Sequence, residues 1–223
     1  MLEREPIPEE ELAKAEQQSR EGWDRKYQEG YHAEMKNVAS LIRRFFEEHH
    51  DEIKPGDKVL EIGCGNGRNL TYMAEQGLNT FGIDISATAL KEAKQILKDK
   101  NLDAHLSEAS FYKLPFADQS FKAIISNASL HSIPWEGAKK AFSEINRVLQ
   151  DNGLFFMRVP ATRIKSENKD LLFHYTRDQL EQLAEENSLI IKLATESPRS
   201  DQRFENDTKI MWQATFQKES RAE

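Results

Sequence analysis

Two hydrophobic periodicities alternate along residues 55–160, and they predict strands separated by helices. Short, almost uninterrupted apolar runs are typical of strands buried on both faces of a parallel sheet, whereas apolar residues three and four positions apart indicate helices. The alternation favours a parallel sheet covered by helices on both sides, with ligands at the carboxyl ends of its strands. The predicted strands are residues 59–62, 80–85, 102–106, 121–127 and 154–159, and the predicted helices are residues 68–76, 86–100 and 138–149.

The segments on either side of this region are less regular. Residues 1–22 are rich in Glu, Gln and Lys, which predicts a solvated helix with a frayed start and no function of its own. We expect an N-terminal helical extension over residues 1–30 and a single α/β domain over residues 31–220. Within that domain the pattern predicts helices over 34–50 and 176–187 and strands over 189–194 and 210–216.

Three glycines separate the first predicted strand from the helix that follows it. Gly63, Gly65 and Gly67 allow the backbone to bend sharply and a ligand to lie directly against it, while a helix N-terminus presents N–H groups. Asp84 ends the next predicted strand, 21 residues after Gly63, where a parallel βαβ unit would place a carboxylate against a ribose diol. This spacing predicts a site for a nucleotide-like ligand.

Together these segments resemble the class I S-adenosylmethionine-dependent methyltransferases. The resemblance implies a Rossmann-like, seven-stranded, mostly parallel sheet with helices on both faces and an antiparallel carboxyl-terminal hairpin, and S-adenosylmethionine as the cofactor. A dinucleotide-binding loop would place its third glycine three residues after the second, and a Walker loop would require Gly-Lys-Ser/Thr. The resemblance rests on Glu61-x-Gly63-x-Gly65-x-Gly67, Gly82-x-Asp84-x-Ser86, Leu114-Pro115-Phe116 with Asp118-x-Ser120-Phe121, and Leu130-His131.

The resemblance also implies which residues bind the cofactor. Asp84 would accept both ribose hydroxyls, and Glu61 would hold either the N–H groups of the loop or the cofactor's ammonium. Ser110 stands where family members often have an Asp that bonds the adenine amino group, and a hydroxyl is a weaker acceptor than a carboxylate. The expected cofactor-binding residues are Tyr27, Glu61, Gly63, Cys64, Gly65, Asn69, Asp84, Ile85, Ser110, Phe111 and Asn127.

Aromatic residues near the N-terminus allow two interpretations. Trp23 and Tyr27, followed by Gly30-Tyr31, resemble a segment that folds over the methionine end of the cofactor in many family members and acts as a lid. Aromatic residues four apart on a helix also pack against the protein body without contacting a ligand. Both interpretations remain open at this point.

Asn127 and His131 follow the fourth predicted strand and are the expected catalytic residues. Methyl transfer is an in-line displacement, so the protein must align the nucleophile, the methyl group and the sulfur. A base is needed only if the nucleophile arrives protonated. His131 is a candidate for that base, although the matching histidine in this family is often a structural or substrate-contact residue.

The composition of the chain limits the classes of binding partner that we expect. The 31 basic and 38 acidic residues give a net charge of −7, which disfavours nucleic acid. Cys64 is the single cysteine, so no internal disulfide forms. No apolar run approaches the roughly 20 residues that a membrane-spanning helix needs. We expect a cytoplasmic protein, monomeric or homodimeric, with no metal and no membrane partner.

The predicted function is methyl transfer to a small-molecule acceptor. Two alternatives stay open at the sequence level. A cofactor-binding scaffold that has lost catalysis is one, because Ser110 departs from the family pattern. A metalloid methyltransferase of the tellurite type is the other, because residues 65–69 resemble the loop of tellurite-resistance methyltransferases.

Overall fold

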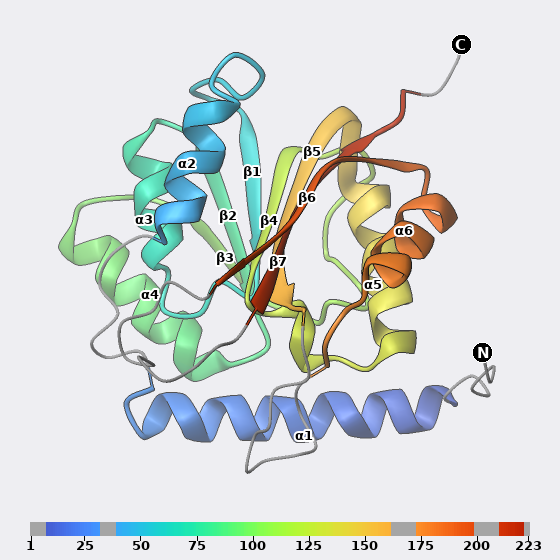
Figure 1. The fold of residues 1–223 in the computed structure, drawn as a ribbon. Helices are drawn as coiled ribbons and strands as arrows, with labels where there is room; N and C mark the ends of the chain where they lie inside the picture. The colour runs from blue at the N-terminus through green and yellow to red at the C-terminus, as the bar shows by residue number, and fades with distance from the viewer. Residues whose placement is uncertain (1–7, 32–38, 162–172, 199–209, 221–223) are drawn as a thin grey trace.

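The protein forms an α/β fold built on one seven-stranded sheet (Figure 1). The structure is a computed structural model that describes residues 8–31, 39–161, 173–198 and 210–220. The strands are β1 (Lys58–Ile62), β2 (Asn79–Asp84), β3 (His105–Glu108), β4 (Phe121–Asn127), β5 (Leu149–Pro160), β6 (Leu189–Pro198) and β7 (Ile210–Lys218). The helices are α1 (Glu9–Gln28), α2 (Ser40–Glu48), α3 (Arg68–Glu75), α4 (Ala87–Asp99), α5 (Trp135–Val148) and α6 (Arg177–Glu186), with a short 3-10 turn at Leu130–Ser132.

The strand order confirms the predicted fold class. It runs β3-β2-β1-β4-β5-β7-β6, with β1 to β5 parallel and β7 antiparallel to both of its neighbours. The chain reverses direction across the sheet between β1 and β4, which lie side by side. At such a switch point the loops after the two strands diverge and leave a crevice for a ligand.

Apolar side chains fill both faces of the sheet. Val59 and Leu60 are adjacent in β1 and both 0% exposed, yet they belong to different clusters because successive strand residues point to opposite faces. On one side Val59 lies in the cluster that holds Phe45 and Met73 from the helices α2 and α3. On the other side Leu60 lies in the cluster that holds Phe142 of α5. Figure 1 shows α2, α3 and α4 on one face and α5 and α6 on the other.

Several predicted boundaries were wrong. The strand predicted over 102–106 is β3, which begins only at His105, because the Leu102 N–H still bonds to the Leu97 carbonyl and completes the end of α4. The helix predicted from residue 138 begins at Trp135, directly after Pro134. Of the helix predicted over 34–50, α2 covers Ser40–Glu48, and residues 32–38 lie outside the described part of the chain.

The motif around Leu114-Pro115-Phe116 is held by α5. The Arg147 guanidinium donates to the carbonyls of Leu114 and Phe116 over 3.0 and 2.8 Å and to Asp118 over 2.9 Å. Glu144, one turn earlier, accepts from the Leu114 N–H over 2.7 Å. The turn before β4 is therefore fixed by these two side chains, and the motif has a structural role.

Helix α1 lies across the end of the sheet at which the parallel strands β1 to β5 have their carboxyl ends (Figure 1). Arg20 donates to the Ile85 carbonyl over 3.0 Å and to the Glu108 carboxylate. Asp24 accepts from the Ser86 hydroxyl over 2.6 Å and from the Thr88 N–H over 3.1 Å. The prediction of a merely solvated N-terminal helix was therefore wrong.

Among the described residues, no helix has the length and apolar character to span a membrane.

Candidate functional site

The loop between β1 and α3, residues 63–67, here called the glycine loop, is shaped by two close contacts. Gly63 and Gly65 have φ values of +71° and +55°, in the left-handed region that favours glycine. A Cβ on Gly63 would lie 2.3 Å from Cβ of Ser129, and a Cβ on Gly65 would lie 2.4 Å from the Tyr27 hydroxyl. Both positions therefore require glycine for close approach as well as for conformation.

The N–H groups of the loop bond within the protein. Gly63 and Cys64 both donate to the Ile83 carbonyl, over 2.8 and 2.9 Å, and Gly67 donates to the Cys64 carbonyl over 3.0 Å. Gly65 donates to Asp84 over 2.8 Å. The N–H groups of Gly63, Cys64, Gly65 and Gly67 are therefore already bonded, and what the loop provides for a ligand is space next to its bend. The expectation that Glu61 binds the N–H groups of the loop is not met at these four positions.

Asp84 lies at the end of β2, and the glycine loop and α4 both donate to it. One carboxylate oxygen accepts from the Gly65 N–H and the other accepts from the Ser86 N–H over 2.9 Å. Burial raises the pKa of Asp84, and the hydrogen bonds from Ser86 and Gly65 oppose that rise. A carboxylate has about four lone-pair positions, so Asp84 keeps some capacity to accept a further hydrogen bond beside those from the backbone.

Glu61 is a fully buried acid in the middle of an apolar strand. One of its oxygens accepts from the Asn69 amide over 2.6 Å, and the other has no hydrogen-bond partner among the described residues. Burial raises the pKa of Glu61 to about 8, against the opposing effects of the Asn69 hydrogen bond and the Arg68 charge. The group is suited to a cationic or hydrogen-donating partner, since an unpaired buried polar atom is costly.

The chain turns sharply after β4, where Asn127 and His131 lie. Ala128 has a φ of +58°, a conformation that costs a residue other than glycine about 1–2 kcal/mol, and its N–H bonds to the Arg158 carbonyl. The Ser129 hydroxyl donates to the Ile62 carbonyl over 2.8 Å and so joins this turn to the end of β1. The side-chain oxygen of Asn127 is buried and has no partner among the described residues.

The loop after β3 meets α1. Ser110 donates its hydroxyl proton to Glu16 over 2.6 Å and accepts from the Tyr112 N–H over 3.1 Å. Tyr112 is close to the same carboxylate: burial raises its pKa to about 12, and the Glu16 charge adds to that rise. The hydroxyl that was expected to face a ligand therefore binds a carboxylate that the sequence analysis did not single out.

The aromatic segment of α1 both packs on the protein body and lines the site. Tyr27 is buried, and burial followed by the Asp84 charge raises the pKa of its hydroxyl, so the group stays protonated. Trp23 contacts Tyr31 with 5.6 Å between ring centroids, and Lys26 lies 4.1 Å above the Trp23 ring. The two interpretations of this segment are therefore compatible in one arrangement.

A single cavity of about 290 Å³ brings these groups together. All the residues predicted as cofactor-binding or catalytic line it: Tyr27, Glu61, Gly63, Cys64, Gly65, Asn69, Asp84, Ile85, Ser110, Phe111, Asn127 and His131. The lining also includes residues that were not predicted, among them Glu16, Lys26, Ser129, Arg158 and Met211. Arg158 had a detectable signal, because it is a charge inside the apolar run 154–159. Glu16 had none, because it belongs to a helix rich in charged residues.

Comparisons with known proteins agree with this arrangement. Residues 59–153 match the family model described as a methyltransferase domain. The chain is 32% identical to an uncharacterized methyltransferase of Synechocystis sp. over 103 residues, which cover 46% of this chain and 47% of that protein. It is 28% identical to an uncharacterized methyltransferase of Geobacillus sp. over 178 residues, which cover 77% of this chain and 78% of that protein. The chain spans less than half the length of the curated relatives to which it is 32–40% identical.

One solved structure matches over nearly the whole chain. It is a Burkholderia thailandensis 1,6-didemethyltoxoflavin-N1-methyltransferase with bound 1,6-didemethyltoxoflavin and S-adenosylhomocysteine. The TM-score is 0.76 at 16% identity, over 98% of this chain and 94% of that one, so the likeness is one of fold. The segment that matches the methyltransferase-domain family, residues 59–153, contains β1, the glycine loop and Asp84, and the sheet as a whole has the fold of the class I S-adenosylmethionine-dependent methyltransferases.

Proposed function

We propose that this chain transfers a methyl group from S-adenosylmethionine to a small-molecule acceptor. The observation that carries the proposal is the continuity of the cavity. It runs from Asp84 and the glycine loop at one end to Asn127 and His131 at the other. The carboxylate proposed to bind the ribose and the candidate reaction centre therefore line one cavity.

The residues present fit the cofactor group by group. The carboxylate of Asp84 would accept hydrogen bonds from the ribose, and the oxygen of Glu61 that has no partner among the described residues suits the methionine ammonium. Ile85 and Phe111 line the cavity on the loops after β2 and β3 and would sandwich the adenine. When bound, the cofactor supplies an electrophilic methyl group on a sulfonium.

The chain's own contribution to transfer would be alignment. Orienting two reactants is worth up to about 7–11 kcal/mol in the most favourable intramolecular cases. Asn127 and His131 lie at the switch point next to β1, where they would contact the acceptor and the methyl group. His131 would also remove a proton from an acceptor that arrives protonated.

A small acceptor is favoured by the cover that α1 provides. Trp23 and Lys26 from this helix, and Tyr31 just after it, line the same cavity as His131, Met211 and Pro134. Arg20 and Asp24 anchor α1 at the cavity, and this cover would restrict the access of a macromolecular acceptor. The net charge of −7 adds a sequence-independent penalty against nucleic acid. The Burkholderia protein, bound to a small heterocycle, provides support by analogy of fold.

Calorimetry and a turnover assay together test the proposal. We expect S-adenosylmethionine and S-adenosylhomocysteine to bind with micromolar affinity. We also expect formation of S-adenosylhomocysteine in the presence of a panel of small oxygen, nitrogen, sulfur and carbon nucleophiles. No heat with either cofactor would overturn the proposal. Binding without turnover for any nucleophile would favour a scaffold, and turnover only with tellurite would favour metalloid methylation.

A further inference from the structure

We propose that Glu16 of α1 reads the adenine of the cofactor by accepting a hydrogen bond from its 6-amino group. The inference rests on the proposed function, because it assigns one end of the same cavity. It adds a specificity-determining residue from the N-terminal helix, outside the matched segment 59–153.

The position of Glu16 follows from the order of the strands. Asp84 would hold the ribose at the end of β2, and the glycine loop after β1 lies on one side of it. The methionine part would run toward that loop, so the base must extend the other way, toward β3. The loop after β3 carries Ser110 and Phe111, and Glu16 lies against it in the same cavity.

The polar group available to a ligand at this end is a carboxylate. A hydroxyl has one proton to donate, and Ser110 donates it to Glu16 over 2.6 Å. The same hydroxyl accepts from the Tyr112 N–H over 3.1 Å. Glu16, by contrast, uses one oxygen for Ser110, while its other oxygen lies 3.8 Å from the Arg20 guanidinium. Acceptor positions of the carboxylate thus remain for a ligand.

The helix fixes the direction of this carboxylate. Arg20, one turn after Glu16, donates to the Ile85 carbonyl, and Asp24, two turns after it, accepts from Ser86. These contacts hold α1 on the loop after β2. The bond between Glu16 and Ser110 joins it to the loop after β3. Glu16 is therefore presented from a rigid element on the same side as Ile85, as a specific contact requires.

An ionised carboxylate accepts hydrogen bonds and donates none. It suits the 6-amino group of adenine, which is a donor. It opposes the 6-oxo group of hypoxanthine, which is an acceptor, because that pairing would set two acceptors against each other with no hydrogen between them. The site should therefore discriminate between an adenosyl ligand and an inosyl ligand.

Calorimetry with S-adenosylhomocysteine and S-inosylhomocysteine tests this assignment on the full chain. The unmodified protein is expected to bind the adenosyl ligand at least about tenfold more tightly. Glu16→Gln is expected to lose that preference or to reverse it, because the amide can donate to the 6-oxo group. Glu21→Gln is the matched control, since Glu21 is exposed on the same helix.

The outcomes separate the two proposals. If Glu16→Gln weakened both ligands by the same factor, Glu16 would only anchor α1, and this inference would be overturned. It would equally be overturned if the variant kept the preference of the unmodified protein. If the unmodified protein bound neither ligand, the proposed function itself would fail, and the inference with it. Thermal unfolding of each variant confirms that the comparison is made on folded protein.

Discussion

The carboxylate of Asp84 accepts a hydrogen bond from the N–H of Gly65 over 2.8 Å and thereby joins the end of β2 to the glycine loop. The group proposed to hold the ribose is thus the same group that fixes the loop against which the methionine part would lie. A change at Asp84 should affect both ends of the cofactor at once.

Asp84→Asn provides the test. An amide keeps the size of the side chain, but its NH₂ group must face either the Gly65 or the Ser86 N–H, which replaces an acceptor by a donor. We expect the dissociation constant for S-adenosylhomocysteine to rise at least about tenfold, with a loss of roughly 1–3 kcal/mol in the free energy of unfolding. Calorimetry and urea denaturation measure the two effects. Asp103→Asn, on the surface, is the control, and unchanged affinity in Asp84→Asn would contradict the ribose assignment.

Gly63→Ala should destabilise the fold as well as block the site. The added Cβ would meet Ser129 at 2.3 Å, and Ser129 is itself bonded to the Ile62 carbonyl. Gly56 also has a positive φ, +90°, but a Cβ there would meet nothing within 4 Å. Gly56→Ala therefore measures the backbone cost alone, about 1–2 kcal/mol. Chemical denaturation should show a clearly larger loss for Gly63→Ala; equal losses would show that the contact with Ser129 is unimportant.

The raised pKa of Glu61 predicts a pH dependence of stability. Burial raises the pKa of Glu61 to about 8 in the folded protein, whereas the unfolded chain releases this proton near the ordinary glutamate pKa of 4.5. The folded state then binds more protons, so this group's contribution to stability is fully present below pH 4.5 and is lost as the pH rises through 8. The slope is at most about 1.4 kcal/mol per pH unit.

Glu61→Gln isolates this contribution, because the amide can still accept from Asn69 but does not titrate. Urea denaturation at pH 5, 6, 7 and 8 should show a smaller decline of the free energy of unfolding in the variant than in the unmodified protein. Parallel curves would contradict the raised pKa. Binding of an ammonium at Glu61 would favour the ionised form, so cofactor binding at pH 7 should also release a proton, which calorimetry in buffers of different ionisation enthalpy detects.

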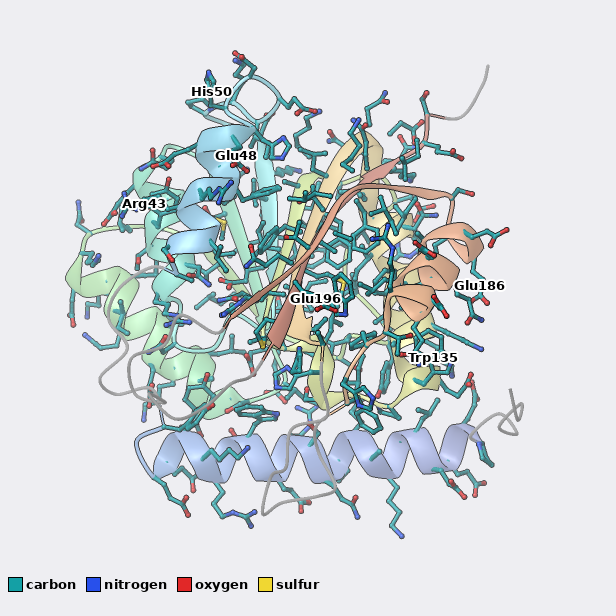
Figure 2. The ribbon with its side chains drawn as sticks, viewed as in Figure 1. Arg43, Glu48, His50, Trp135, Glu186 and Glu196 are labelled. Atoms are coloured by element: carbon teal, nitrogen blue, oxygen red, sulfur yellow. The ribbon has the colours of Figure 1, made fainter. Side chains whose placement is uncertain are left out.

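His131→Gln separates chemistry from cofactor binding. His131 lies on the Asn127 side of the cavity, away from Asp84, so affinity for S-adenosylhomocysteine should change little. With a nucleophile that must lose a proton, kcat should fall at least about tenfold, and the acid limb of its pH profile should disappear. His50→Gln is the control, because Figure 2 shows His50 at the opposite end of the molecule from α1. An unchanged pH profile would assign His131 to substrate contact alone.

Local sequence was sufficient to predict that the glycine loop and Asp84 meet. The spacing from Gly63 to Asp84 is set by the length of one loop, one helix and one strand, so the two ends of a βαβ unit must meet. The ordered alternation of apolar runs likewise predicted the parallel sheet. The β3 boundary failed because Leu102 is apolar in either role, and its backbone bond to Leu97, which extends the end of α4, leaves no trace in the pattern.

The contribution of α1 could not be predicted in the same way. Glu16, Arg20 and Asp24 recur at intervals of four on a charged helix, a pattern that a fully solvated helix shows equally often. Only the tertiary structure reveals that these residues meet Ser110, Ile85 and Ser86. Arg147 is similar: sequence resemblance identified the turn at Leu114, and the structure identifies what holds it.

The length and rigidity of α1 have one more consequence. A helix of 20 residues measures about 30 Å, and its residues from Ala15 to Tyr27 line the cavity, so any movement of the helix would open the adenine end and the reaction centre together. A cofactor and an acceptor that enter past α1 would therefore depend on the same movement. S-adenosylhomocysteine that stayed bound under α1 would also delay the entry of the next acceptor. Turnover would then be limited by the movement of the helix rather than by methyl transfer.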